Sequence, residues 1–451
     1  MTVRNAAAAR RPCDRIDAVR ARVQSLRPFD VRGRVGGISG LRLDVEGIAG
    51  QLSVGDRVWI RARDNTEIAA EAIGFDQDIT RVMSFGQLDG IGPGSCVTVG
   101  GSSHLTVSDQ WLGRVVDPLG RPLDALGPLP GGDERMKLRA DPPNAALRRR
   151  LGPRIDLGVK ALNAFVTCRQ GQRLGLFAGS GVGKSTLLSM LARYTDCDVA
   201  VIALVGERGR ELREFIEDDL GAEGLARSVV VVATSDKPPL MRRECAYAAM
   251  TVAEHFRNQG KSVLLMMDSV TRFCLALREI GLSAGEPPTT RGYPPSVFAE
   301  LPRLLERAGP GLPGTGMITG LFTVLVEGDD HNEPIADAVR GILDGHVVLD
   351  RRIAEAGRFP AIDVLKSLSR TVPGVNNTAE NDATRRARAM LAIWQDMADL
   401  VRLGAYKAGT DPAVDQAVRL APHIEAFLSQ SKNVPSSVAE GFETLTEVLS
   451  G

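Results

Sequence analysis

Short runs of apolar residues that alternate with helical patterns dominate the chain between residues 105 and 370. The clearest runs are residues 199–205, 229–232, 263–267 and 317–326. A strand covered on both faces needs apolar side chains in both directions, so near-continuous runs of this kind indicate buried strands. Strands that alternate with helices form a parallel sheet with helices on both faces. We therefore predict an α/β domain in this part of the chain.

A different pattern occupies residues 31–99, where short alternating apolar stretches are broken by glycine and aspartate. Residues 41–45, 54–60 and 96–99 are examples. Regularly spaced short strands with turn signals predict a small antiparallel β-barrel. Such a barrel can bind oligonucleotides when aromatic residues are interleaved with basic ones. Few residues here have that arrangement, so we expect a packing role and no nucleic-acid partner.

The pattern changes again after residues 371–374, where the chain becomes mainly amphipathic helices, for example over residues 387–403. These changes divide the chain into an N-terminal segment, a β-barrel domain, an α/β domain and a C-terminal helical domain. The predicted boundaries are 1–28, 29–102, 103–372 and 373–451.

The first 28 residues contain seven arginines and only two aspartates. From Ile16 onward, Val19, Val23 and Leu26 recur at a spacing of three to four residues, which predicts a short basic amphipathic helix. One interpretation is a frayed, solvated chain end. The other is a docking helix for a partner protein or an anionic membrane surface. The sequence leaves both interpretations open.

Composition narrows the class of protein. A chain of 451 residues suggests roughly three domains. The charges of its 55 basic and 55 acidic residues cancel, so the protein has no net charge that would attract nucleic acid. No apolar run approaches the ~20 residues of a membrane span, and the N-terminus has no signal-like apolar core. The six cysteines and five histidines are widely scattered, which argues against a disulfide framework or a zinc site.

Residues 173–186 carry the strongest chemical signal, because an apolar strand pattern leads through a glycine-rich loop into a helical pattern. Glycine can adopt backbone angles closed to other residues, so successive N–H groups of the loop can point at phosphate oxygens. The helix that follows adds the positive end of its dipole. Ala178 stands where a P-loop usually has its first glycine. The alternative is a glycine-rich turn before an ordinary helix.

Lys184 and Ser185 favour the phosphate-binding interpretation, since a lysine there reaches the β- and γ-phosphates and a serine hydroxyl binds Mg²⁺. The predicted nucleotide-binding residues are Gly179, Ser180, Gly181, Val182, Gly183, Lys184, Ser185 and Thr186.

Two acidic residues stand at the ends of predicted strands, where open sheets of this kind bind their ligands. Asp268 follows the run 263–267 and is a candidate second ligand for Mg²⁺, although an aspartate at a strand end is often only a cap. Glu207 follows the run 199–205 and can orient a water for attack on the γ-phosphorus. Arg208 and Arg210 beside it are candidate phosphate contacts or ordinary solvated cations.

The chain from about residue 30 to its end resembles the α/β-subunit family of rotary ATP synthases, and more closely its type III secretion branch of flagellar export ATPases and their injectisome relatives. Ala178 supports that branch, whose P-loops typically have alanine there. The segments that carry the resemblance are residues 116–124, 171–185, 206–211, 286–298 and 360–369.

The resemblance implies roles for single residues. Glu207 would be the catalytic carboxylate, which non-catalytic relatives typically lack, and Arg208 a cation on the phosphate side. Asp268 would be the Walker B acid. Phe359 falls where relatives place an aromatic ring against adenine, although from the sequence it is equally a core residue. Arg370 falls where relatives place an arginine that enters the neighbouring subunit's site; without the resemblance it is a surface cation.

The resemblance also implies a fold and a function. The fold is a RecA-like P-loop parallel sheet core with an N-terminal small β-barrel and a C-terminal helical domain. The function is Mg²⁺-dependent ATP hydrolysis by a homohexamer on the cytoplasmic face of the inner membrane, in support of flagellar protein export. Implied partners are a stator-like regulator at the N-terminus, export chaperones with their substrates, and the export gate.

Four alternatives remain open at this point. They are an injectisome ATPase, a catalytic subunit of a rotary synthase, a ring-shaped RNA translocase and a purely structural ring protein.

Overall fold

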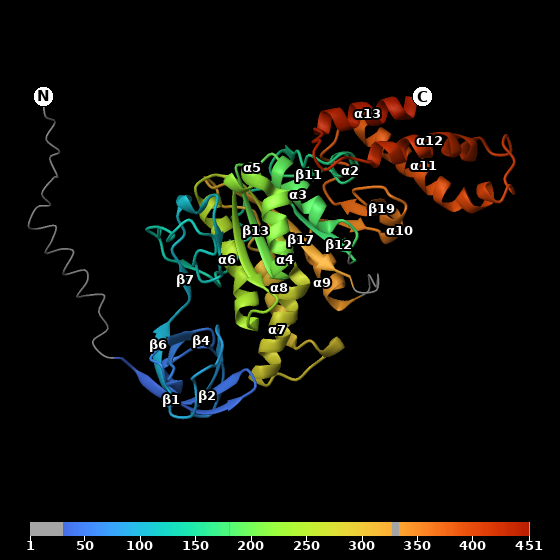
Figure 1. Cartoon of the computed structure of the whole chain (residues 1–451). Helices are drawn as coiled ribbons and strands as arrows, with labels where there is room; N and C mark the ends of the chain where they lie inside the picture. The colour runs from blue at the N-terminus through green and yellow to red at the C-terminus, as the bar shows by residue number, and fades with distance from the viewer. Residues whose placement is uncertain (1–29, 180, 327–332, 451) are drawn as a thin grey trace, which may run out of the picture. The chain divides into compact units, whose positions relative to one another are not determined.

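The computed structural model describes residues 30–179, 181–326 and 333–450. The chain folds into two compact units, one ending at Ser102 and one beginning at Ser103 (Figure 1). The predicted basic helix in residues 1–28 lies outside the described residues.

The first unit is a closed barrel with the strand order β1-β2-β5-β4-β3-β6, and its neighbouring strands are antiparallel. Val35, Leu43 and Val58 point into its core and are almost fully buried, as the alternating pattern predicts. The barrel confirms the interpretation of residues 31–99. Its elements are β1 (Arg32–Ser39), β2 (Arg42–Glu46), β3 (Arg57–Arg61), β4 (Glu67–Asp76), β5 (Ile79–Ser84), β6 (Cys96–Gly101) and a 3₁₀ turn (Ala49–Gln51).

The second unit is built on a sheet with the strand order β19-β18-β12-β17-β15-β13-β14-β8. Neighbours from β18 to β8 are parallel, whereas β19 pairs antiparallel with β18 and β16 pairs antiparallel with β17. The predicted parallel sheet is therefore confirmed, with antiparallel additions. Its strands are β8 (Val115–Val116), β12 (Arg173–Ala178), β13 (Val199–Glu207), β14 (Ser228–Thr234), β15 (Ser262–Asp268), β16 (Gly309–Pro310), β17 (Met317–Leu325), β18 (Gly345–Leu349) and β19 (Ile362–Ser369).

Two small antiparallel pairs complete the strands of this unit. They are β7 (His104–Leu105) with β9 (Met136–Lys137), and β10 (Arg154–Ile155) with β11 (Cys168–Arg169).

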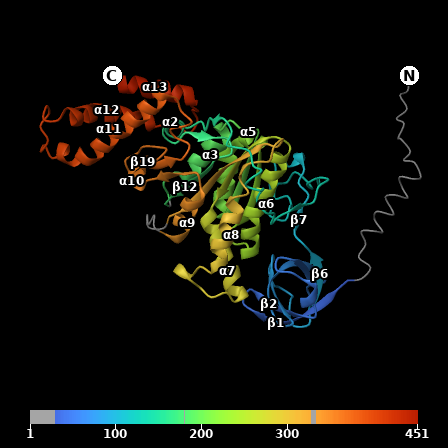
Figure 2. The same ribbon diagram turned by 180° about the vertical axis from the view of Figure 1, so that it is seen from behind.

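Helices cover the sheet, and Figures 1 and 2 show them from opposite sides. In β13, both alternating sets of side chains are buried, Ala200 and Ile202 on one face and Val201 and Ala203 on the other. Helix α6 packs against β13, β14 and β15, and α7 packs against α6 and β17. The helices before the C-terminal part are α2 (Lys160–Phe165), α3 (Lys184–Tyr194), α4 (Gly209–Glu214), α5 (Gly221–Ala226), α6 (Pro239–Asn258), α7 (Val270–Ala284), α8 (Pro295–Leu305), α9 (Pro334–Ile342) and α10 (Arg351–Glu355).

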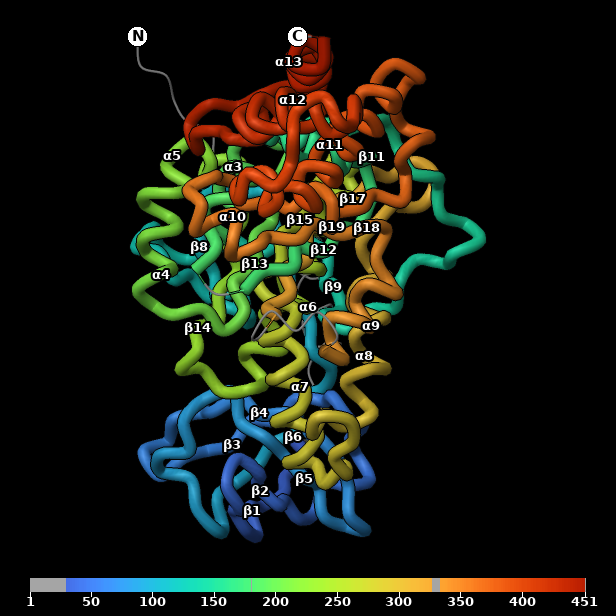
Figure 3. Tube along the Cα trace, turned by 90° about the vertical axis from the view of Figure 1, so that its right-hand side faces the viewer, coloured from blue at the N-terminus to red at the C-terminus, as the bar shows by residue number. Residues whose placement is uncertain are grey.

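Three C-terminal helices, α11 (Thr378–Arg402), α12 (Pro412–Leu428) and α13 (Val438–Ser450), lie together in Figure 3. The first begins with a capping box in which the side chain of Asn377 accepts from the backbone of Glu380 and Glu380 accepts in return. Helix α11 starts earlier than the predicted residue 387, because its first turns carry arginines and Asn381 and only a narrow apolar stripe. The helical C-terminal part is confirmed.

Candidate nucleotide-binding site

The P-loop is formed where β12 ends beside β17 and β18 and the chain turns into α3. Gly181 and Gly183 have φ angles of 78° and 85°, which favour glycine strongly over other residues. A Cβ atom on Gly183 would also lie 3.3 Å from the ring of Phe359. Lys184 is the first residue of α3. Both positions therefore favour glycine by backbone angle, and Gly183 also by space. Ser180 lies outside the described residues.

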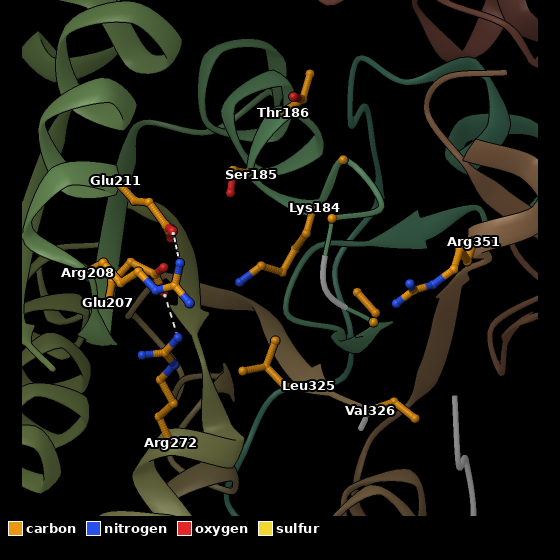
Figure 4. Close-up of a pocket in the computed structure, with 14 residues that line it drawn as sticks. Lys184, Ser185, Thr186, Glu207, Arg208, Glu211, Arg272, Leu325, Val326 and Arg351 are labelled. Carbon is orange, nitrogen blue, oxygen red and sulfur yellow. Dashed lines mark hydrogen bonds and ion pairs between the residues drawn. The ribbon is translucent and has the colours of Figure 1, made fainter. Parts of the chain in front are cut away.

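A pocket of about 660 Å³ opens at this edge of the sheet (Figure 4). Its lining includes several predicted residues: Gly179, Gly181, Gly183, Lys184, Ser185, Thr186, Glu207 and Arg208. Ala178, Glu211, Arg272, Leu325, Val326 and Arg351 complete the lining. Val182 is buried instead, and the exposed Arg210 pairs with Glu214 on α4. The structure thus brings together the loop, its lysine and the acid at the end of β13.

Lys184 and Asp268 form an ion pair in this structure. The Nζ atom of Lys184 lies 2.5 Å from each carboxylate oxygen of Asp268, whose side chain is only 6% exposed. The hydroxyl of Thr323 on β17 donates to Asp268 Oδ1 at 2.7 Å. Because charges at this distance attract strongly in a partly desolvated site, the lysine and the aspartate neutralise each other here.

Glu207 is the last residue of β13, and its side chain is 13% exposed. Burial raises the pKa of its carboxyl group, and the hydrogen bond that it shares with Glu211 raises that pKa further. The same hydrogen bond lowers the pKa of Glu211. Arg272 Nη2 lies 3.8 Å from Glu207 Oε2. The pair of carboxyl groups therefore keeps its proton on Glu207 to a higher pH than an ordinary glutamate would.

Arg208 and Glu211 lie with Glu207 and Arg272 on one side of the pocket in Figure 4. The Nη1 atom of Arg208 donates to Glu211 Oε1 at 3.4 Å. A guanidinium of Arg272 also donates to the carbonyl oxygen of Gly206, just before Glu207. This side of the pocket therefore combines two cations with two acids, next to where the P-loop would hold phosphate.

Sequence reasoning assigned no role to Arg272, Glu211 or Arg351, although all three line the pocket. Glu211 lies within the segment 206–211 that carries the family resemblance. Arg272 lies in the first turn of α7, which begins directly after the strand that ends in Asp268. A charged residue in the first turn of this helix is the sequence signal that could have identified Arg272. Arg351 opens α10, and no pattern in the sequence marked it.

Phe359 and Arg370 lie outside the pocket lining, as do Val182 and Asp268. Phe359 is 43% exposed and lies against Gly183 of the P-loop. Arg370 follows β19, where its backbone N–H donates to Asp344 O at 3.0 Å and its side chain donates to Arg340 O. Asp344 binds Arg173 at the start of β12, and the P-loop follows the other end of that strand. Within one chain, the structure does not bring Arg370 to the pocket.

The oxygen donors at this site fit a magnesium ion that arrives with phosphate. Mg²⁺ in such sites is bound by one or two protein oxygens together with substrate phosphates. Ser185 and Asp268 would supply those oxygens, a hydroxyl and a carboxylate. Within the described ranges, no three His, Cys, Asp or Glu side chains are grouped to hold a metal by themselves. The donor set therefore suits a metal shared with a nucleotide.

Comparison with known proteins identifies the family. The model of the ATP synthase alpha/beta family nucleotide-binding domain matches residues 158–369, and the β-barrel domain of the same family matches residues 35–100. The chain belongs to the ATP synthase α/β family. The C-terminal domain of the type III secretion ATPase EscN matches residues 377–447, which places the chain in the type III secretion branch of the family.

Individual relatives of this family member cover nearly its whole length. A "Flagellum-specific ATP synthase" from Caulobacter vibrioides is 53% identical over 95% of this chain and 98% of that protein. A "Type 3 secretion system ATPase" from Xanthomonas euvesicatoria is 47% identical over 92% and 93%. The solved structure of the assembled ATPase EscN from enteropathogenic E. coli is 40% identical, has a TM-score of 0.86, and covers 92% of this chain and all of that one.

None of the helices that the structure describes is both long enough and apolar enough to span a bilayer.

Proposed function

We propose that this family member is a magnesium-dependent ATPase that works as a ring, a homohexamer, and energises or primes the export of flagellar proteins. The observation that carries the proposal is that the P-loop, Lys184 and the largely buried side chain of Glu207 line one pocket together. The identity of 53% with a flagellum-specific relative supports the flagellar assignment over the injectisome. Purified protein should release phosphate from ATP, and its gene should restore swimming to a strain that lacks its own flagellar enzyme.

Restored injectisome secretion without restored swimming would favour the second candidate, an injectisome ATPase, which the 47% identical relative from Xanthomonas supports. A rotary synthase subunit is a weaker candidate, because the C-terminal domain resembles that of EscN.

Phosphate binding in this proposal begins with the backbone N–H groups of residues 179–183 and the N-terminus of α3. Lys184 would leave Asp268 and bind the β- and γ-phosphates. The released carboxylate of Asp268, together with the Ser185 hydroxyl, would then hold the magnesium ion. A magnesium ion supplies charge neutralisation for the transferred phosphoryl group. The exchange of partners keeps both buried charges compensated before and after the nucleotide binds.

Glu207 would orient the attacking water and accept its proton. Its carboxylate stands at the end of β13 on the same pocket as the P-loop. Arg272 lies close enough to hold it in place, through Glu207 Oε2 and the carbonyl of Gly206. Proton transfer by a positioned side chain contributes about 10²–10⁴-fold to rates. Arg208, on the same side, would face charge on the phosphoryl oxygens. Phe359, next to Gly183, would contact the adenine ring.

The raised pKa of Glu207 predicts a pH dependence of activity. Only the deprotonated carboxyl can accept a proton, so kcat/KM should fall as pH is lowered through that raised pKa, earlier than for an ordinary glutamate. Glu211→Gln removes the neighbouring acid that raises this pKa, and the acidic limb should move to lower pH. Glu214→Gln, on the exposed side of α4, is the matched control. An unmoved limb in Glu211→Gln would show that the two carboxyl groups are not coupled.

We also propose that Arg370 acts in the site of a neighbouring subunit of the assembled ring. Arg370 is exposed and does not line the nucleotide pocket of its own chain, which suits a role in the site of a neighbouring subunit. An arginine supplied in trans can raise the rate by about 10³–10⁵. Two solved structures of a relative support assembly, one of assembled EscN and one of assembled EscN in complex with its central stalk EscO.

Mixing two inactive variants tests this role. Arg370→Ala and Lys184→Ala should each form rings with little activity, and a mixture should recover part of it, because some interfaces then join an intact P-loop to an intact arginine. Steady-state phosphate release measures the recovery. Arg370→Ala that stays fully active as a dilute monomer would make Arg370 a surface cation only.

We also propose where in the cell the enzyme acts and which partners it binds. ATP hydrolysis would help to unload export substrates from their chaperones and deliver them to the export gate. The enzyme would act from the cytoplasm, peripherally at the inner membrane, and its N-terminal segment would bind a stator-like regulator. Deletion of residues 1–28 in the complementation experiment separates this contact from catalysis: ATP hydrolysis should persist while swimming declines.

A further inference from the structure

A second pocket, of about 340 Å³, lies in the same unit between the strand β19 and the helices α10, α11 and α12. Its walls include the apolar side chains of Ile353, Leu391 and Trp394. Arg358, in the loop after α10, and Glu425 of α12 also line it. The lining shares no described residue with that of the nucleotide pocket. Nothing in the proposed ATPase reaction uses this pocket.

Arg358 is the unusual group in this pocket because it is buried and short of hydrogen-bond acceptors. Its side chain is only 10% exposed. Nη2 donates to Ile362 O at 3.0 Å. Nε lies 2.7 Å from Glu425 Oε2, but neither Nε nor Nη1 has an aligned acceptor among the described residues. A guanidinium offers five N–H groups in a planar fork, so Arg358 lacks the acceptors that its burial calls for.

The acidic groups around Arg358 are already committed elsewhere. Lys366 Nζ binds Asp350 at 2.8 Å and Asp363 at 2.9 Å. Asp350 also accepts from the backbone N–H of Arg352, and Asp363 accepts from that of Leu365. Asp399, the remaining aspartate of the lining, lies 3.8 Å from Arg402, so the missing partner of Arg358 must come from Glu425 or from outside the chain.

Glu425 is an imperfect acceptor for the guanidinium of Arg358 and can be displaced from it. Its side chain is 43% exposed, and its contact with Arg358 lacks hydrogen-bond alignment. A planar carboxylate that meets the guanidinium fork with both oxygens forms two parallel, charge-assisted hydrogen bonds. An incoming carboxylate that meets the fork with both oxygens can thus compete with Glu425 for Arg358. A dianion such as phosphate suits the site less, because Asp350 and Asp363 line the same pocket.

We propose that this pocket binds a carboxylate attached to an apolar body, with the carboxylate on Arg358 and the apolar body against Trp394, Leu391 and Ile353. Trp394 offers a large flat contact surface beside the cation, and most ligand pockets combine an apolar lining with a few placed polar groups. Such a ligand has two sources, a free organic acid or an acidic side chain of a partner polypeptide. Both present the same chemistry to Arg358.

Ligand-observed NMR on the full chain without nucleotide tests the site, so the result does not depend on the proposed ATPase activity. Phenylacetate serves as the free acid and phenylacetamide as its neutral isostere. Phenylacetate should bind in the millimolar range, as expected for so small a ligand, and phenylacetamide at least about tenfold more weakly. Equal binding of acid and amide would overturn the proposal.

Two variants should change the affinity in opposite directions. Glu425→Gln removes the competing carboxylate and should tighten phenylacetate binding about tenfold, a gain that misfolding cannot produce. Arg358→Gln should abolish binding, and Arg358→Lys, which keeps the charge and loses the fork, should weaken it. Arg419→Gln, at an exposed position of α12 outside the pocket lining, is the matched control and should stay within about twofold. Unchanged binding in Glu425→Gln, or undiminished binding in Arg358→Gln, would overturn the proposal.

The source of the ligand is distinguished by two blocked peptides, N-acetyl-Phe-Glu-Phe-amide and its Gln counterpart. Binding of the Glu peptide but not of the Gln peptide would assign the pocket to an acidic segment of a partner polypeptide. Binding of phenylacetate with neither peptide would assign it to a free acid. If neither phenylacetate nor the Glu peptide binds, the carboxylate site is wrong.

Discussion

Glu207→Gln is expected to bind Mg-ATP with nearly wild-type affinity and to hydrolyse it about 10²–10⁴-fold more slowly. The substitution keeps the size and the hydrogen-bonding shape of the side chain at the end of β13 but removes its ability to accept a proton. It also removes a buried acid, so the fold should not suffer. Fluorescent nucleotide binding and single-turnover phosphate release measure the two properties on the same protein.

Glu214→Gln provides the control for this experiment, because Glu214 does not line the pocket and carries an exposed ion pair with Arg210. Its turnover should match the wild type. If Glu207→Gln hydrolysed ATP at the normal rate, another group would have to position the water, and the assignment of the catalytic carboxylate would fail.

Lys184→Ala is expected to lower hydrolysis by at least about 10²–10³-fold, since it removes the cation that meets the β- and γ-phosphates. It also leaves Asp268 as a buried carboxylate without its closest partner. Phosphate release and nucleotide binding should therefore both decline.

Asp268→Asn separates the loss of the ion pair from the loss of the phosphate-binding cation, because it frees Lys184 without removing it. ATP in the presence of a chelator should bind this variant about tenfold more tightly than the wild type, since no ion pair has to be broken first. Added Mg²⁺ should no longer strengthen binding, and hydrolysis should be lost. Asp382→Asn, in an exposed pair on α11, is the control. Equal chelated-ATP affinity in Asp268→Asn and wild type would show that the Lys184–Asp268 pair does not restrain the empty site.

The P-loop could be predicted from the sequence because its determinants are local. Gly181 and Gly183 are needed where the backbone has positive φ, and the helical pattern begins at once after Gly183. Asp268 and Glu207 were also predictable, since both end apolar strands whose carboxyl ends meet at one edge of the sheet.

Other parts of the site depend on folding over long distances. The direct contact between Lys184 and Asp268 results from the strand order β12-β17-β15, which no sequence pattern encodes. Arg351 reaches the pocket only because β18 lies beside β12 and α10 follows β18. The Arg358 pocket likewise needs α12 to return over α10. A missing acceptor around a buried guanidinium is visible only once the fold is known.

The closed barrel of the first unit limits how copies of this chain can meet in the proposed ring. An open sheet presents unpaired N–H and C=O groups along its edge strands, and these groups invite edge-to-edge pairing between molecules. In the barrel, β1 pairs with both β2 and β6, so the ladder closes on itself and offers no such edge. Copies that meet through this unit must recognise each other by side chains, and the contact cannot propagate into an endless sheet.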